Sequence, residues 1–130
     1  MTKQYRALIA APPGLMRRSL RAVLATFPIV ELIGEADGCL SAQRMTEIEK
    51  PDIILIATGL PEREVAMLLQ GFQEEERFKP HSIVFVNTNH QKKWAREAGA
   101  DAVLLQSAST HLLANILAQF QTIQPPLTQS

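Results

Sequence analysis

Cysteine is almost absent from this sequence: Cys39 is the only one in 130 residues. A single thiol excludes an internal disulfide and any zinc site built on cysteines. Long hydrophobic runs are absent as well, since runs such as Ile53 to Ala57 have the length of a strand and are too short to span a bilayer. Together with an N-terminus that has no signal-peptide pattern, these absences predict a cytoplasmic protein without membrane association.

Excess charge of either sign is also missing. The 13 Lys and Arg residues balance 13 Asp and Glu residues, giving a formal net charge of +0. This balance removes a general attraction to nucleic acid, so the basic clusters around Arg17 and Lys92 are predicted to be solvated helix faces. What the sequence does have is 46% hydrophobic and 20% charged residues, a composition typical of a folded soluble domain.

Short apolar runs alternate with amphipathic stretches along the chain. Strands are predicted at 7–10, 29–36, 52–57, 82–86 and 101–105, each followed by a helix. The inward sides of the helix over 40–50 and of the last helix are predicted to include Leu40, Ile48 and Leu112. This order predicts an α/β protein with a flavodoxin-like, doubly wound five-stranded parallel sheet, a (βα)5 three-layer sandwich. Residues 1–123 would form the domain and residues 124–130 a tail or linker, with functional residues at the carboxyl ends of the strands.

Several short segments in a fixed order carry a resemblance to a known family. They are Leu15 to Arg21, Gly34 to Ala36, Lys50 to Asp52, Pro61, and Ala98 to Asp101. In this order and spacing they make the chain, from Arg6 to about Ile123, similar to the receiver domains of bacterial two-component response regulators, especially those joined to helix-turn-helix output domains. The resemblance implies the doubly wound fold and a role in signal transduction.

The resemblance also implies a phosphorylation site, and this chain departs from it at every position. The family has two acidic residues after the first strand that hold Mg²⁺, a phosphoaccepting aspartate after the third, a Thr or Ser after the fourth and a Lys after the fifth. In the same order, this chain has Ala11, Pro12, Ala57, Asn87 and Gln106. An alanine methyl and a proline ring offer Mg²⁺ no oxygen, and Ala57 has no nucleophile. We therefore expect no catalytic residue, metal or cofactor and no enzymatic activity. The resemblance then implies a pseudo-receiver, a phosphorylation-independent module of transcriptional or two-component regulation that works through a protein partner or homodimer.

Polar, uncharged residues surround these positions, and two interpretations of them stay open. Thr58, Thr88 and Ser107 can cap helices and satisfy loops, which is common for Thr and Ser at such places. Alternatively, they line a pocket at the carboxyl edge of the sheet and the domain senses a small neutral molecule. The nearest carboxylates, including Glu35 and Asp37, are expected on the rim, without rebuilding a metal site.

The last helix is the predicted interface. The segment from Asn87 to Gly99 is shorter than the usual family spacing, so the fourth helix, predicted over about 92–98, is expected to be short or displaced. That helix belongs to a surface through which many receivers associate, and self-association is therefore expected to favour the outer side of the last helix. This side offers His111, Asn115 and Gln119. Elsewhere, Cys39 is expected to be a packing residue rather than a reactive thiol, and Trp94 to be partly buried.

Overall fold

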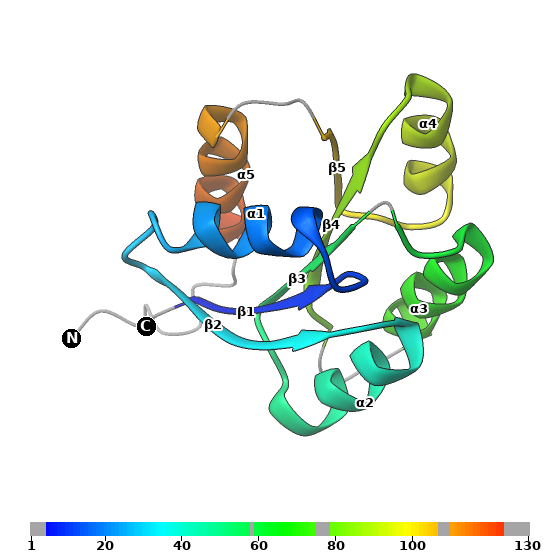
Figure 1. Cartoon of the computed structure of the whole chain (residues 1–130), viewed down its shortest axis with the longest axis horizontal. Coiled ribbons are helices and arrows are strands. Elements are labelled where there is room, and N and C mark those ends of the chain that lie inside the picture. Colours follow the sequence, from blue (N-terminus) through cyan, green and yellow to red (C-terminus); the bar gives the residue numbers. More distant parts are fainter. Residues whose placement is uncertain (1–4, 58, 75–78, 107–109, 124–130) are drawn as a thin grey trace.

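The computed structural model describes residues 5–57, 59–74, 79–106 and 110–123. Strands and helices alternate through these segments (Figure 1). The elements are β1 (Tyr5–Ala10), α1 (Leu15–Leu24), β2 (Val30–Ala36), α2 (Cys39–Glu49), β3 (Ile53–Ile56), α3 (Glu62–Glu74), β4 (His81–Val86), α4 (Asn89–Glu97), β5 (Ala102–Leu105) and α5 (Thr110–Ile123).

The described strands form one sheet in the order β2-β1-β3-β4-β5, and each neighbouring pair is parallel. Helices α2, α3 and α4 cover one face, and α1 and α5 cover the other (Figure 1). This order is that of flavodoxin-like doubly wound sheets, so the predicted fold class is confirmed. In such a sheet, the carboxyl ends of β1, β3, β4 and β5 reach one common edge.

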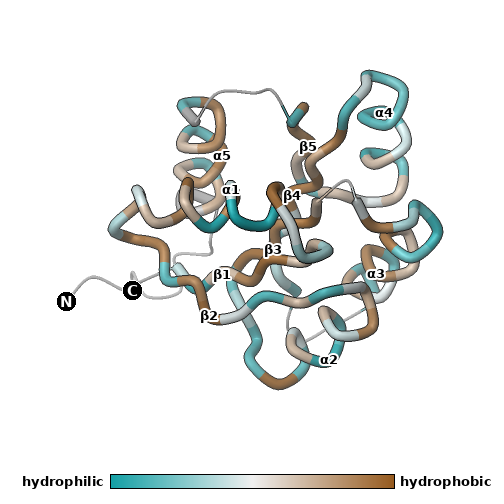
Figure 2. The backbone as a smooth tube through the Cα atoms, viewed as in Figure 1, coloured by the Kyte–Doolittle hydropathy of each residue, from teal (hydrophilic) through white to brown (hydrophobic). Residues whose placement is uncertain are grey.

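The central strand β3 is buried on both faces. Ile54 belongs to the cluster under α2, α3 and α4, whereas Leu55 belongs to the cluster under α1 and α5. Side chains alternate between the two faces of a strand, so a continuous apolar run is required where both faces are covered. Figure 2 shows this apolar character concentrated along the strands, in the centre of the molecule.

Two helix boundaries follow from local backbone chemistry. Gly14 precedes α1 with φ of 147°, a value that an L side chain rarely adopts, and it follows two prolines that cannot continue a ladder. Helix α2 ends at Lys50, which has φ of 50° and stands before Pro51. The guanidinium of Arg6 on β1 donates to the carbonyl oxygens of Glu49 and Lys50, which satisfies the open end of the helix.

The predicted inward sides of two helices are partly wrong. Leu40 and Ile48 on α2 are 65% and 76% exposed, and Leu112 on α5 is 46% exposed. Small residues face the core instead on α2, where Cys39, Ala42 and Thr46 are buried. Their i, i+3, i+7 spacing fits one helix face, and the Thr46 hydroxyl donates to the Ala42 carbonyl at 2.7 Å, which allows a polar residue to be buried.

Candidate functional site

The residues at the phosphorylation-site positions lie at the carboxyl edge of the sheet but bring no reactive group there. Ala11 and Ala57 are buried, at 0% and 1% exposure, and their backbone amides donate to the carbonyl oxygens of Ala36 and Ala10. These two positions therefore extend the sheet hydrogen bonding and present only methyl groups. Gln106, after β5, is exposed, and its backbone amide donates to the Val86 carbonyl at 2.7 Å.

Pro12 lies against the connection between β3 and α3. A Cβ atom placed on Gly59 would be only 2.8 Å from Cγ of Pro12, so the ring occupies the space above this glycine. Such a distance is below that of real carbon contacts, and glycine is the residue that permits the approach. An apolar ring therefore closes this side of the edge, at a position where the resemblance called for a metal-binding carboxylate.

The neighbouring carboxylates are engaged by two arginines of α1. Arg21 makes a two-point contact with Glu35, with Nε 2.7 Å and one terminal nitrogen 2.8 Å from the carboxylate oxygens. Arg17 lies 2.6 Å from the Asp37 carboxylate and 3.5 Å from that of Glu35. The hydrogen bonds from Arg21 lower the pKa of Glu35, whereas burial opposes this shift.

These ion pairs occupy the carboxylates at the rim. Within the segments that the structure describes, no group of three or more His, Cys, Asp or Glu residues could hold a metal ion. The carboxylates of Glu35 and Asp37 already accept hydrogen bonds from arginine, which competes with any cation for the same oxygens.

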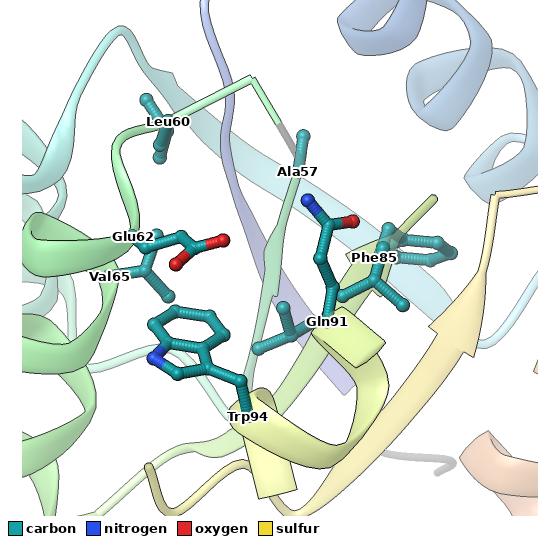
Figure 3. A pocket seen from close by; sticks show the side chains of 9 residues that line it. Ala57, Leu60, Glu62, Val65, Phe85, Gln91 and Trp94 are labelled. Atoms are coloured by element: carbon teal, nitrogen blue, oxygen red, sulfur yellow. The ribbon is translucent and has the colours of Figure 1, made fainter. Parts of the chain in front are cut away.

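A small apolar cavity remains beside the phosphoacceptor position, between β3, α3 and α4. It is lined by Ala57, Leu60, Glu62, Val65, Val84, Phe85, Val86, Gln91 and Trp94. Figure 3 shows the Trp94 indole beside Val65 and Glu62, with the Gln91 side chain extending toward Ala57. Its volume is about 20 Å³, which is room for about one water molecule and not for an organic ligand.

Helix α4 begins with side-chain caps that the sequence analysis did not identify. The Thr88 hydroxyl accepts a hydrogen bond from the Gln91 amide at 3.1 Å, and the Gln91 side-chain oxygen accepts one from the Asn87 amide at 2.8 Å. This is close to the reciprocal capping of a Thr-x-x-Gln sequence, which is the signal that could have been read. The helix starts at Asn89, earlier than predicted, and at 9 residues it is short.

The polar edge residues are thus only partly placed. Thr88 lies at this edge and serves as the helix cap, and Asn87 beside it is exposed. Thr58 and Ser107 lie outside the described residues. What the structure shows of Thr88 agrees with the capping interpretation.

The predicted interface residues lie on one exposed face. His111, Asn115 and Gln119 of α5 are all exposed. Leu112 adds an apolar residue at the start of the same helix, and Leu15, at the start of α1 on the same side of the sheet, is 73% exposed. We call these five residues the α1–α5 surface.

The expectations for Cys39 and Trp94 are confirmed. Cys39 is buried in the core under α2, and burial, with a smaller contribution from Glu64, raises the pKa of its thiol to about 11. A thiol of high pKa is protonated at neutral pH and a poor nucleophile, which fits packing rather than reactivity. Trp94 is half-buried and packs against the same core cluster.

Comparison with known proteins places this architecture. The receiver domain of the response regulator NarL from Mycobacterium tuberculosis superposes with a TM-score of 0.74 at 17% identity, covering 92% of this chain and 98% of that domain. A LuxR-family response regulator from Aurantimonas gives a TM-score of 0.74 at 19% identity, over 98% of this chain and 94% of its own. This is the fold of a response-regulator receiver domain. The predicted resemblance is thereby confirmed for the fold.

The sequence relatives are longer than this chain. An uncharacterized transcriptional regulatory protein of Bacillus subtilis, YhcZ, is 30% identical over an alignment of 103 residues that covers 76% of this chain and 47% of that protein. A protein-glutamate methylesterase/protein-glutamine glutaminase of Vibrio vulnificus is 26% identical over 105 residues, 81% of this chain and 28% of the other. The chain therefore spans half or less of the length of these curated relatives. No family model matches the sequence.

The helices of the receiver fold are short or polar. In the described segments, no helix combines the length and the apolar character needed to cross a membrane.

Proposed function

We propose that this chain is a pseudo-receiver, a signalling domain that acts through protein contacts and without phosphorylation. The observation that carries the proposal is the buried methyl group of Ala57 at the phosphoacceptor position, 1% exposed and backed by the sheet. The receiver fold supports a place in two-component or related regulation, where receiver domains of transcriptional regulators are mostly non-enzymatic. The named role of YhcZ in transcriptional regulation favours that branch over the methylesterase relatives.

The chemistry of phosphoryl transfer supports the loss of function at this edge. Transfer needs a nucleophilic oxygen, a divalent cation held by carboxylates and a positive charge on the transferring group. Here Ala57 supplies no nucleophilic side-chain oxygen, Ala11 and Pro12 supply no carboxylate, and Gln106 supplies no charge. Glu35 and Asp37 do not substitute for them, because Arg17 and Arg21 hold their oxygens.

A regulator that receives no phosphoryl group needs another way to transmit its state, and a protein interface is the simplest. We place it on the α1–α5 surface, which combines the exposed apolar side chains of Leu15 and Leu112 with polar residues. Helix α4 is a weaker choice, because it is short and its exposed side chains are mostly charged, with Lys93, Arg96 and Glu97 among them, and charged residues are depleted from the cores of interfaces. The partner is a second copy of the chain or another regulatory protein.

The phosphorylation claim is tested by adding beryllofluoride or acetyl phosphate with Mg²⁺ and recording ¹H–¹⁵N NMR spectra. We expect no saturable, Mg²⁺-dependent change at the amides of Ala11, Ala57 or Asn87. A receiver domain that retains its acidic residues, treated identically, serves as the positive control for the reagents. Saturable shifts at these amides would contradict the proposal.

A further inference from the structure

A second surface lies on the opposite side of the sheet from the α1–α5 surface. Helices α2 and α3 pack side by side there and leave a groove of about 580 Å³ between them. Leu40 and Met67 stand on its two sides and are 65% and 66% exposed. We call this feature the α2–α3 groove.

The exposure of these two apolar residues is not needed for the fold. Cys39 and Ala42 already provide the buried contacts of α2, and Leu68 and Leu69 provide those of α3. Two large apolar side chains that face a common groove differ from singly scattered ones, since together they offer a contact site. The unbranched, polarizable side chain of Met67 adapts to different partners.

The groove is open above Gly71, one of the residues that line it. A Cβ atom added to this residue would meet nothing within 4 Å, so the space above it is free. Glycine in the middle of a helix costs stability relative to alanine, and no left-handed backbone angle requires it here. Gly71 therefore leaves open space in the lining of the groove, one helical turn along α3 from Met67.

The charge of the groove has one sign. Its lining contains the carboxylates of Glu64 and Glu74, and none of the described lining residues is positively charged. The two glutamates are ten residues apart on α3, which corresponds to about 15 Å along the helix axis. Besides these two carboxylates, the lining holds the exposed apolar side chains of Leu40 and Met67 and the neutral amides of Gln43 and Gln70.

We propose that the α2–α3 groove docks an amphipathic, basic helix of a partner protein. Its apolar side chains would lie over Gly71 between Leu40 and Met67, and its Lys or Arg residues would lie near Glu64 and Glu74. A groove between two helices is a common receptor for a helix, and the two carboxylates select a basic one. The inference goes beyond the proposed function because it concerns the opposite face of the sheet and holds whether or not the chain self-associates.

The probe is a synthetic amphipathic peptide of about 18 residues, with Leu at i, i+3, i+7 in its centre and Lys toward both ends. Fluorescence anisotropy measures its affinity, and NMR locates it through the methyl groups of Leu40 and Met67. We expect saturable binding with shifts at both methyls, and no binding of the same peptide with every Lys replaced by Glu. Failure of the Lys peptide to bind, or equal binding of the Glu peptide, would overturn the proposal.

Two variants test the site itself. Gly71→Leu fills the groove and suits a helix better than glycine, so it is expected to fold and to weaken binding at least about tenfold. Glu64→Lys with Glu74→Lys is expected to do the same. The matched control is Glu47→Lys with Glu97→Lys, which reverses exposed carboxylates outside the groove and should leave binding unchanged.

The remaining outcomes are also decisive. Peptide binding that survives both groove variants would show that the peptide docks elsewhere. A concentration-dependent dimer of the natural chain that disappears in Gly71→Leu would make a second copy the occupant, against the proposal. Neither result bears on the phosphorylation test, so the two proposals fail separately.

Discussion

The imidazole ring of His81 stacks on the ring of Phe120, with centroids 4.4 Å apart and planes inclined by 8°. The Tyr5 hydroxyl is hydrogen-bonded to Nδ1 of the same histidine at 3.1 Å. These contacts join β1, β4 and α5 at the amino end of the sheet, away from the phosphorylation-site positions. They fix the helix that carries most of the α1–α5 surface.

Replacing Phe120 should therefore loosen α5. Phe120 is 5% exposed, and Phe120→Ala removes both the stack and its packing, for an expected loss of about 3–5 kcal/mol in the free energy of unfolding. Leu112→Ala, on the same helix but 46% exposed, is the control and should cost less than about 1 kcal/mol. Urea denaturation followed by circular dichroism measures both. Equal losses in the two variants would show that the stack does not hold the helix.

The central strand gives a second prediction. Ile54→Asp places a charge where exposure is 0%, and leaving it unpaired costs on the order of several kcal/mol, so this variant should be largely unfolded. Ile48→Asp makes the same chemical change where exposure is 76% and should fold normally. Thermal melting compares the two variants. A cooperative, unshifted transition for Ile54→Asp would contradict the double burial of β3.

The ion pair between Arg21 and Glu35 gives a pH prediction. Because the pKa of Glu35 is lowered in the folded chain, the pair stabilises it at pH values above the ordinary 4.5 of the carboxyl. That contribution disappears as the pH falls from there through the lowered pKa. In Arg21→Ala the pKa of Glu35 should rise, which NMR titration of its side-chain carboxyl measures. Arg18→Ala, an exposed arginine on the same helix, should not change it; an equal rise in both variants would assign the shift to general charge.

Features that depend on a local residue pattern could be predicted from the sequence, whereas features that depend on tertiary packing could not. The continuous apolar run from Ile53 to Ile56 is typical of a strand that is buried on both faces, so β3 and the parallel sheet could be predicted. The inward side of α2 could not be predicted in this way, because the small residue Ala42 packs against the sheet while the larger Leu40 stays exposed. Apolar size alone therefore misplaced the helix face.

The candidate site divides in the same way. The missing reactive groups could be predicted from residue type, since the side chain of Ala57 is a methyl group and carries no oxygen in any conformation. The contact of Pro12 with Gly59 and the pairing of Glu35 with Arg21 join segments apart in sequence, and only the fold brings them together. The cap of α4, by contrast, depends on a local Thr-x-x-Gln pattern and could have been predicted from the sequence.

Self-association provides the last prediction. If the α1–α5 surface forms a two-fold contact, equivalent residues of two copies face each other, and new negative charges there crowd like charges together. Asn115→Glu with Gln119→Glu should therefore shift a monomer–dimer equilibrium toward monomer by at least about tenfold, as measured by sedimentation equilibrium. Both positions are exposed, so the substitutions should leave the fold intact. Lys92→Glu with Arg96→Glu is the control: it places two negative charges on α4 instead and should leave the equilibrium unchanged. A dimer that resists the α5 substitutions but dissociates with those on α4 would move the interface to the fourth helix, and with it the surface through which this domain acts.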